Sequence, residues 1–170
     1  QNGSEVIACL REANDEFIKF TKDLSEKTGN PIHLINLDLE NEINVKEAAK
    51  QIVTMNKEID ILVNNAGTIF TGIFQMTPMS KLRELFQVNF FSQTIFTQII
   101  SKKMIKNKKG SIIYISSSSA IDANEGRSAY SASKSALISQ AKTLARELGV
   151  YNIRVNSIAP GLTDTDMMKK

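Results

Sequence analysis

The chain has 170 residues, of which 42% are hydrophobic and 23% charged, and its formal net charge is +3. This is the ordinary balance of a globular domain with one sizeable core, and so mild a charge does not by itself indicate a nucleic-acid partner. The single cysteine, Cys9, excludes a disulfide framework within the chain and suits a reducing compartment. No apolar run approaches the roughly 20 residues of a membrane-spanning helix, and no signal-peptide pattern is present, so we expect a cytoplasmic protein without a membrane partner.

Short apolar runs alternate with amphipathic stretches along the whole chain. We predict strands at 6–10, 32–39, 60–63, 111–115 and 153–158, and helices at 13–28, 45–55, 79–106 and 128–148. The helix at 79–106 is long enough to bend, and Asn89 marks the place. Strands that alternate with helices imply a parallel sheet with helices on both faces, a doubly wound α/β fold of the Rossmann type. No internal boundary or repeat interrupts the pattern, so residues 1–170 are predicted to form a single domain.

Polar or turn-forming residues lie at the end of every predicted strand. They are Arg11, Asp38, Asn64-Asn-Ala-Gly67, the four serines at 116–119, and Pro160-Gly161. Ligands of parallel α/β sheets bind beyond the carboxyl ends of the strands. The sequence therefore predicts one binding crevice at that edge. It predicts no metal site, and Cys9 and His33 sit among apolar residues, where a structural role is expected.

Tyr130 and Lys134 are four residues apart in a stretch whose alanines and leucines recur at helical spacing. Four residues of helix rise about 6 Å, so both side chains lie on one face. A lysine ammonium about 4 Å from a phenol stabilises the phenolate by about 4 kcal/mol at an effective dielectric of about 20. Such a pair suits general acid–base chemistry near neutral pH, although the spacing alone also fits a surface tyrosine and lysine on an amphipathic helix.

The motifs together, in this order, resemble the short-chain dehydrogenase/reductase family in its single-domain branch. The matching positions span almost the whole chain: Asn64-Asn-Ala-Gly67, Asn89, a serine after the fourth strand, Tyr130-x-x-x-Lys134 and Pro160-Gly161. The resemblance implies hydride transfer between a nicotinamide cofactor and a carbonyl or alcohol.

The resemblance also implies a role for each catalytic position. Tyr130 would be the general acid for carbonyl reduction and the base for alcohol oxidation. Lys134 would favour the phenolate and hold the nicotinamide ribose. Ser117, thirteen residues before Tyr130, would hydrogen-bond the substrate carbonyl, with Ser116 pointing to the other face of its strand. Asn89 would hold a water that relays protons to the lysine.

The cofactor positions are carried over in the same way. The residues expected to contact the dinucleotide, besides Tyr130 and Lys134, are Arg11, Asp38, Leu39, Asn65, Ala66, Gly67, Pro160, Gly161 and Thr165. Asp38 and Leu39 resemble the pair beside the adenine, and Pro160 and Gly161 those near the nicotinamide. A carboxylate at the end of the first strand would suit the ribose hydroxyls of NAD. This chain has Arg11 there, and a guanidinium suits a 2′-phosphate, so NADP is expected over NAD.

One departure from the family pattern is large. No strand with a glycine-rich turn precedes the first predicted strand, and the chain stops at Met167-Met-Lys-Lys170. We therefore expect an internal piece of a longer protein, without its first βα unit and its C-terminal segment. Such a piece is expected to bind dinucleotide poorly and to be inactive alone.

The substrate and the assembly follow from the resemblance only. Pro160-Gly-Leu-Thr-Asp-Thr-Asp-Met167 is similar to the segment in 3-oxoacyl-(acyl carrier protein) reductases, so a 3-oxoacyl thioester is the expected substrate, and a homodimer or homotetramer the expected assembly. Two alternatives stay open. A nucleotide-sugar epimerase or dehydratase shares Tyr-x-x-x-Lys but not the Asn-Asn-Ala-Gly turn, and a non-catalytic dinucleotide sensor usually lacks the tyrosine that is present here.

Overall fold

The computed structural model describes residues 3–55, 57–122 and 124–163. The strands are β1 (Val6–Leu10), β2 (Ile32–Asn36), β3 (Ile61–Asn64), β4 (Gly110–Ile115) and β5 (Ile153–Ile158). The α-helices are α1 (Asp15–Thr28), α2 (Glu42–Thr54), α3 (Met79–Phe86), α4 (Ser92–Asn107) and α5 (Ser128–Gly149). A π-helical turn, η2 (Gln87–Phe91), joins α3 to α4, and two short 3-10 turns are η1 (Phe74–Met76) and η3 (Ser118–Ala120).

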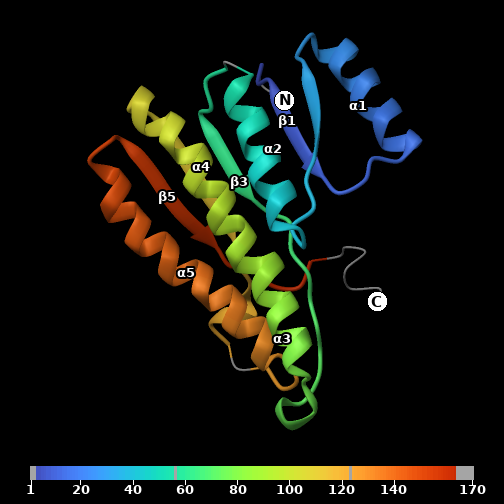
Figure 1. Cartoon of the computed structure of the whole chain (residues 1–170), viewed down its shortest axis with the longest axis vertical. Helices are drawn as coiled ribbons and strands as arrows, with labels where there is room; N and C mark the ends of the chain where they lie inside the picture. The colour runs from blue at the N-terminus through green and yellow to red at the C-terminus, as the bar shows by residue number, and fades with distance from the viewer. Residues whose placement is uncertain (1–2, 56, 123, 164–170) are drawn as a thin grey trace.

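The predicted alternation of strands and helices is confirmed, and every strand pair is parallel. The strands form two sheets, however, with the orders β1-β2 and β3-β4-β5. Within the described ranges no strand joins one sheet to the other, so the hydrogen-bond ladder is interrupted between them. Figure 1 shows α2, α4 and α5 running across one side of the strands, and α1 on the other side of the β1–β2 sheet. Helices therefore lie on both faces, as the doubly wound pattern predicts.

The main core lies between β4, β5 and the helices α2, α4 and α5. Its members are apolar side chains that are entirely or almost entirely removed from solvent: Val45, Ile100, Met104, Ile112, Tyr114, Leu137 and Ile153. They come from the apolar faces that the sequence pattern identified on each element. This core holds β4 and α5 together, and the next residues along both elements build the site.

Two boundaries lie three residues away from their predicted positions, each for a local reason. β2 ends at Asn36 and not at residue 39, because Asp38 forms a turn in which its Oδ1 accepts a hydrogen bond from Glu40 N at 2.9 Å. α2 begins before Val45, because Asn41 Oδ1 caps the helix by accepting from two backbone N–H groups. The irregularity expected near Asn89 is the π-helical turn η2, a feature often found at functional sites.

Candidate active site

The candidate site lies where the ends of β3 and β4 meet the start of α5 and the π-helical turn. Asn64 ends β3, and Ser116 and Ser117 follow β4 directly. Tyr130 and Lys134 lie in the first two turns of α5. The structure thus brings together the carboxyl edge of a parallel sheet and the predicted tyrosine–lysine pair.

Lys134 is buried and is held at the end of β4 from two sides. Its Nζ donates a hydrogen bond to the Ile115 carbonyl oxygen at 2.8 Å, and its own carbonyl oxygen accepts one from Ser116 Oγ at 2.8 Å. The Nζ also lies 6.0 Å from the centroid of the Tyr130 ring. Burial lowers the pKa of Lys134 to about 8, so the amine remains mostly an ammonium at neutral pH, and it lies beside the phenol ring.

The lowered pKa of Lys134 predicts that stability rises with pH. Between pH 8 and 10.5 the folded lysine is mostly neutral while the unfolded lysine keeps its proton, so the unfolded state binds more protons. We expect the free energy of unfolding, measured relative to a Lys134→Met variant, to rise by about 3 kcal/mol across this window. Urea unfolding of both full-length proteins at several pH values measures the difference, and a difference independent of pH would contradict the prediction.

Asn89 connects the turn after β3 to α5. It is fully buried in η2, where its Oδ1 accepts from Thr68 N at 2.8 Å and its Nδ2 donates to Thr68 O at 2.9 Å. The Nδ2 also donates to Ser133 Oγ at 3.0 Å, and Ser133 Oγ donates to the Tyr130 carbonyl oxygen at 2.7 Å. One amide side chain therefore fixes the spacing between the Asn64–Gly67 turn and the helix that carries the tyrosine.

Gly67 lies close to two buried polar side chains of the site, those of Asn89 and Lys134. A Cβ added at this glycine would lie 3.0 Å from Asn89 Oδ1 and 3.2 Å from Lys134 Nζ. Both distances are shorter than ordinary van der Waals contact. The backbone of the predicted cofactor turn and the predicted lysine are therefore neighbours, and any side chain at position 67 would require one of the two groups to shift.

Ser116 and Ser117 differ in burial, as the alternation of side chains along a strand predicts. Ser116 is buried and faces α5 through its bond to the Lys134 carbonyl oxygen. Ser117 is half-buried and caps η3, where its Oγ accepts a hydrogen bond from Ser119 N at 3.2 Å. Ser118 N donates to the Pro160 carbonyl oxygen at 2.8 Å. The serine loop and the loop after β5 thus lie together at the same edge of the sheet.

The first turns of α4 anchor two loops on the predicted cofactor side. Ser92 Oγ donates to the Leu39 carbonyl oxygen at 2.6 Å, and Gln93 Nε2 donates to the Ala66 carbonyl oxygen at 2.7 Å. Both side chains are buried. The loop after β2 and the turn after β3 are therefore fixed by adjacent residues of one helix.

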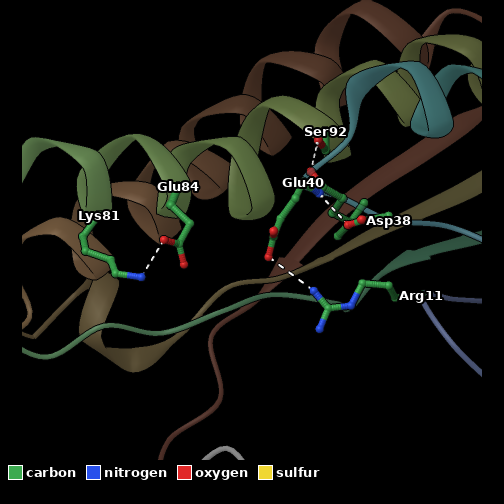
Figure 2. A network of polar contacts seen from close by, with 7 residues as sticks. Arg11, Asp38, Glu40, Lys81, Glu84 and Ser92 are labelled. Atoms are coloured by element: carbon green, nitrogen blue, oxygen red, sulfur yellow. Dashed lines mark hydrogen bonds and ion pairs between the residues drawn. The ribbon is translucent and has the colours of Figure 1, made fainter.

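The other described residues that were predicted to contact the cofactor lie at the rim of the site. Arg11 follows β1, and its Nη1 lies 3.4 Å from Glu40 Oε1 (Figure 2). Asn65 and Gly161 are exposed, and Pro160 is half-buried. Thr165 lies outside the described residues.

Several residues of the site escaped the sequence analysis. They are Thr68, Ser92, Gln93 and Ser133, which hold other site residues in place, and Glu40, which contacts Arg11. Ser133 had a signal, since it lies three residues after Tyr130 on the same helix face. Gln93 is a polar residue on the buried side of a helix, a pattern that indicates a structural or functional contact.

The residues expected to be structural lie apart from these contacts. Cys9 is half-buried on β1, and burial raises its pKa to about 11. His33 Nε2 on β2 lies 2.5 Å from Glu5 Oε1, which Lys57 also contacts. Among the described residues, no group of three His, Cys, Asp or Glu side chains could hold a metal ion, and no helix is long and apolar enough to cross a membrane.

Comparison with known proteins places this geometry in a family. The model of the family described as short chain dehydrogenase matches residues 1–170. The chain is similar to the 3-oxoacyl-[acyl-carrier-protein] reductase of Aquifex aeolicus, with 36% identity over 146 residues that cover 86% of this chain and 59% of that protein. The reductase of the same name from Thermotoga maritima is 34% identical over 172 residues, which cover 100% of this chain and 68% of the relative.

A solved structure agrees with these matches. A short-chain dehydrogenase from Streptomyces avermitilis superimposes with a TM-score of 0.85 and 30% identity, over 96% of this chain and 58% of that one. The chain thus spans about three fifths to two thirds of the length of the relatives it matches. The match over every residue, together with a tyrosine–lysine pair at the edge of a parallel sheet, shows that the chain belongs to the short-chain dehydrogenase family.

Proposed function

We propose that the protein transfers a hydride between NADP(H) and a carbonyl or alcohol, with a 3-oxoacyl thioester as the substrate in the reducing direction. The observation that carries the proposal is the position of Lys134 Nζ. It lies beside the Tyr130 ring and close to Gly67, and among the described residues its hydrogen bond goes to the Ile115 carbonyl oxygen. An amine with N–H groups left to donate, between a phenol and a turn that admits close approach, suits a nicotinamide ribose.

The described residues fit the two ends of a dinucleotide. At one end, the glycine at position 67 lets the backbone of the turn come close to Lys134, the residue expected to hold the nicotinamide ribose. At the other end, Asp38 and Leu39 lie in a loop fixed by Ser92, next to the Arg11 guanidinium. When bound, the nicotinamide supplies or accepts the hydride.

The protein's own residues handle the proton and the orientation. In reduction, Tyr130 gives its hydroxyl proton to the carbonyl oxygen while the carbonyl carbon gains the hydride, so the product is an alcohol. The Lys134 ammonium stabilises the phenolate that remains. Ser117 donates a hydrogen bond to the carbonyl oxygen, and Asn89 keeps the Gly67 turn at a constant distance from α5.

The test of the proposed function is turnover of NADPH by the full-length protein with acetoacetyl-coenzyme A. Loss of NADPH absorbance that depends on the thioester supports the proposal. No turnover with this thioester or with simple ketones would contradict it.

Ser117 offers a sharper version of the same test. A Ser117→Ala variant is expected to lower kcat by about 10²-fold, because the carbonyl oxygen loses a donor as negative charge develops on it. Ser118→Ala is the matched control, since that serine contacts the site through its backbone N–H. Equal kcat values for the two variants would remove Ser117 from the mechanism.

The relatives support the substrate class. Both reductases named above act, by their names, on 3-oxoacyl groups carried on acyl carrier protein. The support for NADP is the Arg11 guanidinium at the end of β1, which provides a bidentate donor for a 2′-phosphate.

A further inference from the structure

Arg11 and Glu40 face each other across the rim of the proposed cofactor site. The Arg11 Nη1 atom lies 3.4 Å from Glu40 Oε1, and the two side chains are 68% and 58% exposed. Figure 2 shows the pair beside the Asp38 turn, with Glu84 and its partner Lys81 farther along the same side of the helices. The guanidinium expected to receive a 2′-phosphate is thus already in contact with a carboxylate.

Both members of the pair are carried on anchored backbone. Asn36 Nδ2 donates to the Arg11 carbonyl oxygen at 2.6 Å and fixes the end of β1 against the end of β2. Glu40 N donates to Asp38 Oδ1 at 2.9 Å. The residue between, Leu39, is bound through its carbonyl oxygen to Ser92. The backbone positions of Arg11 and Glu40 are therefore set by the fold.

Arg11 and Glu40 have opposite effects on the affinity for a ribose that carries a 2′-phosphate. A phosphate on the ribose adds a charge of about −1.5 to −2, which Arg11 attracts and Glu40 repels. An exposed ion pair is weak, so a phosphate can displace the carboxylate from the guanidinium. The carboxylate remains nearby and can accept hydrogen bonds from free ribose hydroxyls, as acidic residues do in NAD sites.

We propose that Glu40 is a specificity-determining residue that opposes Arg11 and sets the ratio of NADP to NAD affinity. This inference rests on the proposed function, because it assumes that the adenosine end of a dinucleotide lies at this rim. Glu40 lowers the preference for the 2′-phosphate by occupying Arg11 and by repelling the phosphate, and it retains affinity for the unphosphorylated ribose. The chain therefore accepts both cofactors, with a smaller NADP preference than Arg11 alone would give.

The experiment measures the binding of two nucleotides that differ in the phosphate alone, 2′,5′-ADP and 5′-AMP, by calorimetry with the full-length protein. Glu40→Gln is expected to tighten 2′,5′-ADP by about three- to tenfold and to leave 5′-AMP unchanged or weaker. Arg11→Gln is expected to weaken 2′,5′-ADP. Glu84→Gln is the matched control, because Glu84 already pairs with Lys81 at 2.7 Å and is expected to change neither affinity.

The outcomes separate this inference from the function on which it rests. A selective gain for 2′,5′-ADP in Glu40→Gln, absent in Glu84→Gln, supports the proposal, and a parallel rise in the NADPH to NADH ratio of kcat/KM extends it to the complete cofactors. Binding of both nucleotides with no selective change in Glu40→Gln overturns the inference and leaves the proposed function standing. Failure of both nucleotides to bind the unmodified protein overturns both.

Discussion

Replacing Tyr130 with phenylalanine in the full-length protein is expected to lower kcat by about 10²- to 10⁴-fold. The ring stays in place, but the hydroxyl that gives a proton to the carbonyl oxygen is lost. The ring is almost fully buried on α5, and phenylalanine keeps its volume, so the fold is expected to persist. The dissociation constant for NADPH is expected to stay within about twofold, because Lys134 keeps its anchoring bond to Ile115.

Two measurements decide this prediction. Single-turnover kinetics with a thioester substrate give the chemical step, and a fluorescence titration with NADPH gives binding. Tyr151→Phe is a suitable control, since that tyrosine lies beyond the C-terminal end of α5 and is partly exposed. Unchanged kcat in Tyr130→Phe, or an equal loss in the control, would show that the tyrosine does not transfer the proton.

Replacing Gly67 with alanine is expected to lower kcat by between about tenfold and about hundredfold. The new methyl would lie 3.0 Å from Asn89 Oδ1 and 3.2 Å from Lys134 Nζ, so one of these groups must move by a few tenths of an ångström. Small displacements of a group that orients the reaction are costly, and about 1 Å can cost about 10²-fold in rate. Lys134, which is proposed to hold the nicotinamide ribose, is one of the two groups that the methyl would displace, so KM for NADPH is expected to rise as well.

Gly149→Ala is the matched control for this change. Gly149 ends α5, and an added Cβ there meets nothing within 4 Å. Thermal unfolding of both variants shows whether lost activity reflects lost folding. A Gly67→Ala protein with normal kcat and normal KM would mean that the close approach of the turn to Lys134 has no part in binding or catalysis.

The contacts around Asn89 show why the site is sensitive to such small changes. Asn89 and Thr68 form two hydrogen bonds, and a third joins Asn89 to Ser133 on α5. Buried amide groups that are fully bonded resist displacement, because each lost bond leaves a desolvated polar atom. The π-helical turn brings the Asn89 side chain into this position, which a regular helix with α geometry would present differently.

Local pattern was enough to predict most of the elements. Strand and helix positions were predicted from apolar periodicity, because a side chain's burial in this fold repeats with the period of its own element. Errors arose where a single polar side chain changed the backbone, as at Asp38, whose turn ends β2 early, and at Asn41, whose cap begins α2 early. The division of the strands into two sheets depends on which strands lie side by side, and periodicity does not report pairing.

The sequence by itself determined the parallel α/β class and the pair formed by Tyr130 and Lys134, because helical spacing alone puts residues four apart on one face. The tertiary structure alone decided which distant groups meet. It joins Asn89 to Thr68 and Ser133, places Gly67 over Lys134, and sets Glu40 against Arg11. These contacts join segments that are far apart in the chain, and their formation depends on how the elements pack, which no local spacing encodes.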